Sequence, residues 1–128
     1  MSKIIIHTDK APAAVGPYSQ AVVAPTGKMV FLSGQVGLEP VTGALVTESF
    51  EAQVEQAFNN MLRVIEAAGG DAHSIIKLTL YLTDLSQFTK VNEIMARVIP
   101  QPFPARSTVG VTSLPLAATF EVEAIIVV

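Results

Sequence analysis

The sequence predicts a single α+β domain in which two helices lie on one face of a mixed or antiparallel β-sheet. Two stretches repeat apolar residues at spacings of three and four, as amphipathic helices do. A strand-length stretch with alternating apolar and polar residues separates them, and further short apolar runs lie before and after. No repeat, linker or low-complexity segment interrupts the sequence, so residues 1–128 are expected to form one domain.

Short strands are expected in the N-terminal part of the chain. Residues 3–7 form a short apolar run, whereas residues 8–18 contain glycine and prolines and are expected to form a loop. Two further apolar runs, residues 19–24 and 28–35, are separated by Pro25-Thr26-Gly27, which is typical of a hairpin turn. We therefore expect these two runs to form a hairpin.

The first helix is the clearest element of the sequence. Apolar residues recur at helical spacing from Phe50 to Ala68. Ser49 is suited to cap the start of this helix, because its hydroxyl can accept a hydrogen bond from a free backbone N–H. Gly69-Gly70 is suited to end it, because glycine adopts the left-handed conformation that closes many helices.

A strand and a second helix follow. In residues 76–82 the apolar side chains Ile76, Leu78, Leu80 and Leu82 are expected to share one face of the strand. The second helix is expected to begin near Asp84, which together with Gln87 resembles a capping box. Its apolar stripe is expected to consist of Phe88, Val91, Met95 and Val98. Three prolines, Pro100, Pro102 and Pro104, are expected to end the helix.

Two final strands are predicted over residues 106–111 and 119–128, joined by a turn around Leu114-Pro115. If these strands pair across the turn, Arg106 and Glu121 fall roughly opposite each other, and opposed charges attract. Such an ion pair needs no substrate. Alternatively, the planar guanidinium of Arg106 could hold the carboxylate of a small acid at two points. The spacing leaves both interpretations open.

Three further residues are candidates for a binding site. Tyr18 follows Gly16-Pro17 in a rigid turn, and its phenol could donate a hydrogen bond into a pocket or simply pack. Gly34 ends a predicted strand, and a glycine there permits close approach of a substrate to the backbone. Asn92 borders the apolar stripe of the second helix, so its amide either satisfies a buried polar group or points into a cavity.

Several kinds of chemistry find no support in the sequence. The chain has no cysteine, and His7 and His73 lack the spacing of metal ligands. A phosphate-binding loop, a dinucleotide fingerprint and a nucleophile elbow are all missing. We therefore expect neither a metal nor an organic cofactor.

Composition and charge restrict the expected partners and location. Charged residues make up 15% of the chain, against roughly 25% in typical soluble domains, and 50% of the residues are apolar. We therefore expect apolar surface to be buried between identical subunits, which would also cover the free face of the sheet.

The net charge of −3 and the scattered basic residues argue against nucleic-acid binding. The apolar runs are too short for a signal peptide or a membrane span, and the lack of cysteine fits a reducing compartment, so a cytoplasmic protein is expected.

Several segments, in this order over nearly the whole chain, resemble the Rid (YjgF) family of reactive intermediate imine deaminases. They include Gly16-Pro17-Tyr18-Ser19-Gln20, Ser33-Gly34-Gln35, Phe103-Pro104-Ala105-Arg106-Ser107 and Glu121-Val122-Glu123-Ala124. The resemblance implies a chorismate mutase-like α+β fold and a homotrimer with three clefts at the subunit interfaces. It also implies hydrolysis of 2-imino acids, such as 2-iminobutanoate and 2-iminopropanoate, to 2-oxo acids and ammonia.

The resemblance also implies roles for individual residues. Arg106 would hold the substrate carboxylate, and Glu121 would orient or activate the attacking water. Tyr18 and Asn92 would line the pocket, and Thr108 would contact the substrate through its backbone. The chain departs from the family pattern at Met95, where many relatives have an aromatic residue, and at Leu116, where many have lysine. These departures would affect substrate preference or trimer contacts.

Other functions remain as alternatives. Relatives are also claimed to bind small 2-oxo acids without catalysis or to act as holdase-like interaction proteins, and the low charge content suits both. Ribonuclease activity is claimed within the family as well, but the negative net charge makes it the weakest candidate here.

Overall fold

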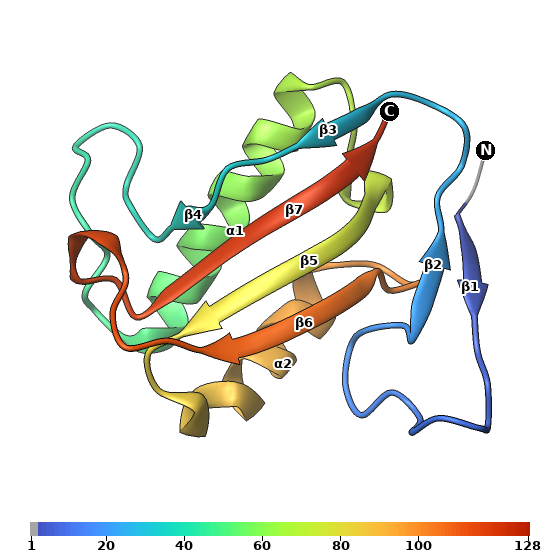
Figure 1. The fold of residues 1–128 in the computed structure, drawn as a ribbon. Coiled ribbons are helices and arrows are strands. Elements are labelled where there is room, and N and C mark those ends of the chain that lie inside the picture. Colours follow the sequence, from blue (N-terminus) through green and yellow to red (C-terminus); the bar gives the residue numbers. More distant parts are fainter. Residues whose placement is uncertain (1–2) are drawn as a thin grey trace.

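The computed structural model describes residues 3–128 as a β-sheet with two helices behind it and a small β-ribbon at one side (Figure 1). The strands are β1 (Ile4–Ile6), β2 (Ala21–Val23), β3 (Met29–Phe31), β4 (Gln35–Val36), β5 (Ile75–Leu82), β6 (Ala105–Gly110) and β7 (Phe120–Val127). The helices are α1 (Phe50–Ala67) and α2 (Phe88–Val98), with short 3₁₀ turns η1 (Ala72–Ser74), η2 (Leu85–Gln87) and η3 (Pro115–Ala117).

The main sheet is mixed. Its strands lie in the order β3–β7–β5–β6, and β4 also pairs with β7. The β5–β6 pair is parallel, whereas β7 runs antiparallel to β3, β4 and β5. Both helices pack on the same face (Figure 1), so the expected mixed sheet with two helices on one face is confirmed. The opposite face is called the open face below.

The N-terminal hairpin prediction was wrong. Residues 19–24 and 28–35 do contain strands, but β2 pairs with β1, while β3 pairs with β7 in the main sheet. Pro25-Thr26-Gly27 therefore carries the chain from the ribbon to the sheet. A turn signal locates a change of direction, but it does not specify which strand provides the hydrogen-bonding partner.

Helix α1 follows its sequence signals closely. The Ser49 hydroxyl accepts a hydrogen bond from the Ala52 N–H (3.0 Å), and Gly69 adopts a φ of 90° just after the helix. The buried face of α1 packs against β7 in the core, where the rings of Phe58 and Phe120 lie 5.4 Å apart. These observations confirm both predicted ends of the helix.

Strand β5 differs from its prediction at its start. A register shift against β7 lies between Ile75 and Lys77, so Ile75 is fully buried and Ile76 is not. Leu78, Leu80 and Leu82 lie in the core as predicted. The placement of Ile76 with these leucines was wrong, because the bulge breaks the simple alternation of side chains.

Helix α2 begins later than expected. Asp84 caps the turn η2, and its carboxylate accepts hydrogen bonds from the Ser86 N–H (3.0 Å) and hydroxyl (2.7 Å). These bonds lower the pKa of Asp84. The Gln87 backbone N–H donates a hydrogen bond to the Asp84 carbonyl (3.1 Å). Asp84 and Gln87 therefore stabilise the turn η2, and α2 starts at the next residue, Phe88.

The final two strands are not neighbours. Strand β5 lies between β6 and β7 and pairs with both of them. The predicted pairing of β6 with β7 across the Leu114-Pro115 turn was therefore wrong.

Neither α1 nor α2, the α-helices described in residues 3–128, combines the length and apolar character needed to cross a bilayer.

One buried amide connects three parts of the fold. The Gln53 side chain is 5% exposed, donates to the Val46 carbonyl (3.0 Å) and accepts from the Thr119 N–H (2.7 Å) and hydroxyl (2.9 Å). Replacing Gln53 by leucine is expected to lower the free energy of unfolding by about 2–3 kcal/mol, because buried groups lose their partners. Urea unfolding would measure this loss. The control Gln56→Leu removes only a half-buried bond to Asn60 (2.8 Å), so its cost should stay below about 1 kcal/mol.

Candidate functional site

The first candidate group lies at the start of β6, on the helix face of the sheet. Arg106 pairs in register with Leu78, whose side chain is fully buried under the helices. The Arg106 guanidinium carbon lies 4.8 Å from the centre of the Tyr18 ring and 5.3 Å from that of Phe88. Nη1 donates to the Asn92 Oδ1 (2.7 Å), so Asn92 fixes the guanidinium between the two rings.

Arg106 is a half-buried cation surrounded by uncharged groups. Burial lowers the pKa of Arg106, an effect that the Tyr18 hydroxyl partly opposes, and arginine remains charged at neutral pH. Within residues 3–128, no carboxylate forms an ion pair with it. The π-faces and the amide support the charge without neutralising it. This arrangement is suited to an external anion, which could use the remaining N–H donors.

The loop carrying Tyr18 is held against the start of β6. The Ser19 N–H donates to the Pro104 carbonyl (2.9 Å), and the Ser19 hydroxyl donates to the Phe103 carbonyl (2.6 Å). Gly16 approaches so closely that an added Cβ would lie 3.3 Å from the Arg106 Nη2. These contacts explain why a Gly-Pro-Tyr turn far along the chain from Arg106 ends beside it.

Thr108 lies two residues after Arg106, in register with the buried Leu80 and thus on the same face. Its hydroxyl oxygen is buried and has no hydrogen-bond partner within the described chain. A buried hydroxyl without a partner is costly unless a ligand or water satisfies it. We call Tyr18, Phe88, Asn92, Arg106 and Thr108 the Arg106 cluster.

Glu121 does not belong to this cluster. It pairs in register with Tyr81, which alternates with the buried leucines of β5 and therefore faces the open side of the sheet. Arg106 and Glu121 thus lie on opposite faces, with β5 between their strands. The expected cross-strand pair of Arg106 and Glu121 was wrong, because the parallel crossover inserts β5 between the two final strands.

Gly34 lies against Glu121. A Cβ on Gly34 would come within 2.8 Å of the Glu121 carboxyl carbon, and still closer to its Oε2. On the same face, the Tyr81 hydroxyl donates to Glu123, and this hydrogen bond is the main reason that the pKa of Tyr81 is raised. The six predicted site residues therefore separate into two groups. Four lie in the Arg106 cluster, and Gly34 and Glu121 lie on the open face.

Two neighbours of Arg106, Phe88 and Met95, were predicted as part of the apolar stripe of the second helix, and Met95 also as a departure from the family pattern. Phe88 stacks on the guanidinium, and the Met95 sulfur lies 3.5 Å from Nη1. Together with Asn92 they follow one face of α2 at a spacing of four and three residues. This spacing was visible in the sequence, but nothing local indicated that the face meets an arginine. Within residues 3–128, no cluster of histidine and acidic side chains could hold a metal ion.

The chain resembles known proteins both in sequence and in fold. Residues 8–128 match the sequence model of the family described as Endoribonuclease L-PSP. "Reactive Intermediate Deaminase A, chloroplastic" of Arabidopsis thaliana is 50% identical over 98% of this chain, which spans 66% of that protein. "2-iminobutanoate/2-iminopropanoate deaminase" of Homo sapiens is 40% identical over 94% of this chain and 87% of its own. The crystal structure of RidA from Psychrobacter sp. PAMC 21119 superposes with a TM-score of 0.77, at 44% identity over 98% of this chain and 99% of its own.

Proposed function

The chain belongs to the family described as endoribonuclease L-PSP, the Rid (YjgF) family, and from this premise we propose that it hydrolyses 2-imino acids to 2-oxo acids and ammonia. The observation that carries the proposal is Arg106, a half-buried guanidinium supported by uncharged groups. Small 2-imino acids, such as 2-iminobutanoate and 2-iminopropanoate, carry the carboxylate that such a group binds. In this proposal Tyr18, Asn92 and Thr108 line the pocket around it.

The proposed site is completed by a second copy of the chain. Because Glu121 and Gly34 lie on the face of the sheet opposite to Arg106, one protomer cannot direct both groups at one substrate. We propose a homotrimer in which the open face of one subunit approaches the Arg106 cluster of its neighbour. Three clefts would result, each with Arg106 from one subunit and Glu121 from another.

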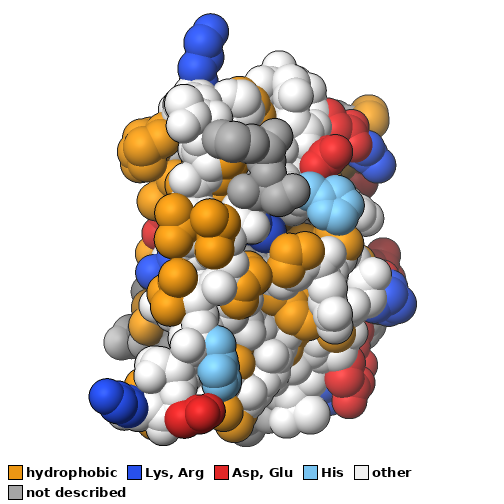
Figure 2. Space-filling model, turned by 90° about the vertical axis from the view of Figure 1, so that its right-hand side faces the viewer, with side chains coloured by type: hydrophobic (Ala, Val, Ile, Leu, Met, Phe, Trp, Pro, Cys, Tyr) orange, Lys and Arg blue, Asp and Glu red, His pale blue; other side chains and the backbone are white. Residues whose placement is uncertain are grey.

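Exposed apolar side chains support this assembly. Phe31 on the edge strand β3 is 68% exposed, and its register partner Ile125 lies on the open face. Figure 2 shows apolar side chains gathered on the side that carries the β1–β2 ribbon, where Ile4 and Val23 are exposed. A monomer would leave this surface in water. Sedimentation velocity at micromolar concentration is expected to show a trimer, and a monomeric species would contradict the proposed site.

The proposed reaction needs positioning of the substrate and proton transfers through Glu121. Arg106 fixes the carboxylate, and water attacks the adjacent C2 carbon of the protonated imine while Glu121 accepts a proton from the water. Glu121 returns that proton to the nitrogen of the resulting carbinolamine, which leaves as ammonia, while the Glu121 carboxylate takes the proton of the carbinolamine hydroxyl and the 2-oxo acid remains. The ammonia then takes up this last proton as ammonium, which restores the Glu121 carboxylate. The reaction is a hydrolysis, in which the substrate is neither oxidised nor reduced. Holding the imine and the water in one cleft lowers the entropic part of the barrier.

A coupled assay tests the proposal. An amino-acid oxidase generates 2-iminobutanoate, and the release of ammonia is followed with and without the protein. Faster release than in the spontaneous reaction is expected, at an unchanged rate of amino-acid oxidation. A folded protein that accelerates nothing would contradict the proposed activity.

Gly34 is expected to act through Glu121 in this reaction. An alanine at position 34 would push the Glu121 carboxylate aside, because a flexible side chain yields more easily than the backbone. Gly34→Ala is therefore expected to lower kcat by up to about 100-fold with little change in the temperature of unfolding. Steady-state kinetics and a thermal melt measure both. An unchanged kcat would show that Gly34 does not hold Glu121 in place.

Non-catalytic binding of 2-oxo acids is the second candidate, because the Arg106 cluster is complete within one chain and needs no Glu121 to hold a carboxylate. A binder would be protected against melting by 2-oxobutanoate but would release no ammonia. A holdase-like protein would instead suppress the aggregation of an unrelated unfolding protein. Ribonuclease activity would require RNA binding that weakens steeply with salt, which the net charge of −3 disfavours. The proposed location is the cytoplasm.

A further inference from the structure

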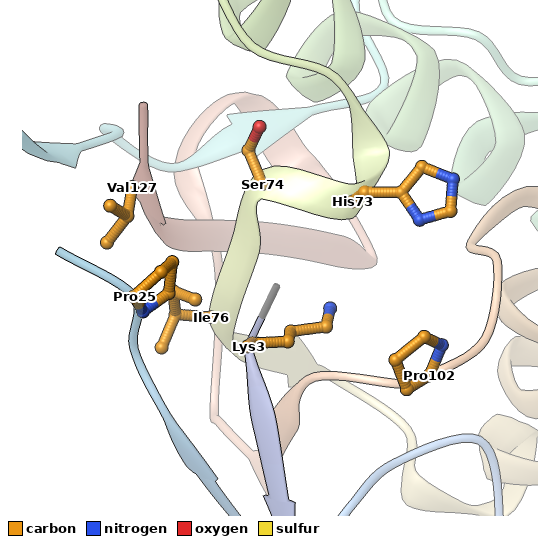
Figure 3. Close-up of a pocket in the computed structure, with 7 residues that line it drawn as sticks. All are labelled: Lys3, Pro25, His73, Ser74, Ile76, Pro102 and Val127. Atoms are coloured by element: carbon orange, nitrogen blue, oxygen red, sulfur yellow. The ribbon is translucent and has the colours of Figure 1, made fainter. Parts of the chain in front are cut away.

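A cavity lies at the Ile75 end of β5 and shares none of its lining residues with the proposed catalytic site. It encloses about 280 Å³ and is lined by Lys3, Pro25, His73, Ser74, Ile76, Pro102 and Val127 (Figure 3). These residues come from the start of the chain, the linker after β2, the turn η1, strand β5, the loop before β6 and the end of β7. None of them takes part in the proposed hydrolysis.

Lys3 provides the charged group of this cavity. Its amino group is half-buried, and it points toward His73 and Pro102 (Figure 3). It donates one hydrogen bond to the Ile75 carbonyl (2.9 Å), and within residues 3–128 no carboxylate pairs with it. Burial lowers the pKa of Lys3, because the charged form loses water without gaining an anion. An anion entering the cavity would stabilise the ammonium.

The bulge in β5 shapes the cavity wall. The register shift between Ile75 and Lys77 turns Ile76 out of the helix-facing row, so that it lines the cavity. The same bulge presents the Ile75 carbonyl that orients Lys3. Bulges of this kind re-aim side chains and are common next to functional sites. The bulge in β5 therefore places the Ile76 side chain in the cavity wall and also fixes the position of the Lys3 amino group.

The remaining walls combine one further donor with apolar surface. The His73 ring lies on the Lys3 side of the cavity (Figure 3). The Asp71 carboxylate accepts a hydrogen bond from the His73 backbone N–H (2.8 Å), and the Ser74 hydroxyl accepts one from the Asp71 N–H (3.1 Å). The Asp71 carboxylate and the Ser74 hydroxyl are therefore both used in capping η1. Pro25, Pro102 and Val127 add apolar surface.

We propose that this cavity binds a small monocarboxylate with a short apolar chain. The carboxylate would accept hydrogen bonds from the Lys3 amino group and the His73 ring, and the alkyl part would lie against Ile76 and Pro25 (Figure 3). One half-buried ammonium matches one negative charge, and an apolar wall favours a carbon chain over a phosphate. The cavity lies just below the usual range of about 300–1,000 Å³ for ligand pockets, so only a small molecule fits.

Butanoate titrations test the proposal independently of the proposed enzyme activity. The full chain carrying Arg106→Gln serves as the background, so that the Arg106 cluster contributes no carboxylate binding. Isothermal calorimetry on this background is expected to show saturable butanoate binding. Adding Lys3→Gln should weaken it by about tenfold or more, since a hydrogen bond to a charged group is lost. Adding Lys10→Gln, which removes an exposed lysine, should leave it unchanged.

Chemical-shift mapping in the same background provides a second measurement that does not require a Lys3 variant. Butanoate is expected to shift the amide signals of His73, Ser74 and Ile76. No saturable binding, or equal loss in the Lys3→Gln and Lys10→Gln variants, would overturn the proposal. Shifts confined to other parts of the chain would overturn it as well.

Discussion

Replacing Arg106 by glutamine is expected to lower kcat/KM for 2-iminobutanoate by about 10²- to 10⁴-fold, which corresponds to losing two charge-assisted hydrogen bonds. The guanidinium is the one group of its cluster that carries a full charge, and the planar fork can hold both oxygens of a carboxylate. Glutamine is two atoms shorter and uncharged, and the groups that surround Arg106 are uncharged too, so the substitution leaves no buried charge without a partner. The loss should therefore appear in kinetics more than in stability.

Two further variants sharpen this prediction. Arg106→Lys keeps the positive charge without the planar fork, so its activity should fall between those of the wild type and Arg106→Gln. Arg97→Gln removes an exposed arginine that pairs with Glu55 on α1 (2.5 Å), and it should leave kcat/KM unchanged. Full activity of Arg106→Gln in the coupled oxidase assay would refute the proposed carboxylate site.

Replacing Glu121 by glutamine is expected to lower kcat by about 10²- to 10⁴-fold, the usual contribution of a general base. KM should change little, because the substrate carboxylate binds to Arg106. The matched control is Glu123→Gln, which removes a carboxylate two residues along the same face that accepts from Tyr81. If kcat fell as far in Glu123→Gln as in Glu121→Gln, Glu121 would not be the specific proton acceptor, and the open face would contribute only negative charge.

Mixing the two inactive variants tests whether the site is shared between subunits. Arg106→Gln and Glu121→Gln chains, refolded together in equal amounts, should recover about a quarter of the wild-type activity in a random cyclic trimer. Each cleft needs an intact arginine from one subunit and an intact glutamate from its neighbour, and each requirement is met half of the time. If both groups acted within one protomer, no mixture would recover activity.

Those parts of the fold that depend on neighbouring residues could be predicted from the sequence. The extent of α1, its cap at Ser49 and its end before Gly69 follow from helical spacing and local hydrogen bonds. The alternation along β5 correctly predicted that Leu78, Leu80 and Leu82 are buried, because a strand turns successive residues to opposite faces, but it failed at Ile76, where the bulge interrupts that order. The motifs around Tyr18 and Arg106 identified a family, and through it most of the candidate site.

Strand pairing and contacts between distant side chains could not be predicted from the sequence, because they depend on how the whole domain packs. The backbone hydrogen-bonding groups of a strand are the same for every partner, so an apolar run does not specify its neighbour. For this reason the hairpin between β2 and β3 and the pairing of β6 with β7 were predicted wrongly. The separation of Arg106 from Glu121 and the cavity around Lys3 arise between segments far apart in the chain. Their positions depend on packing over the whole domain, and no short stretch of sequence contains that information.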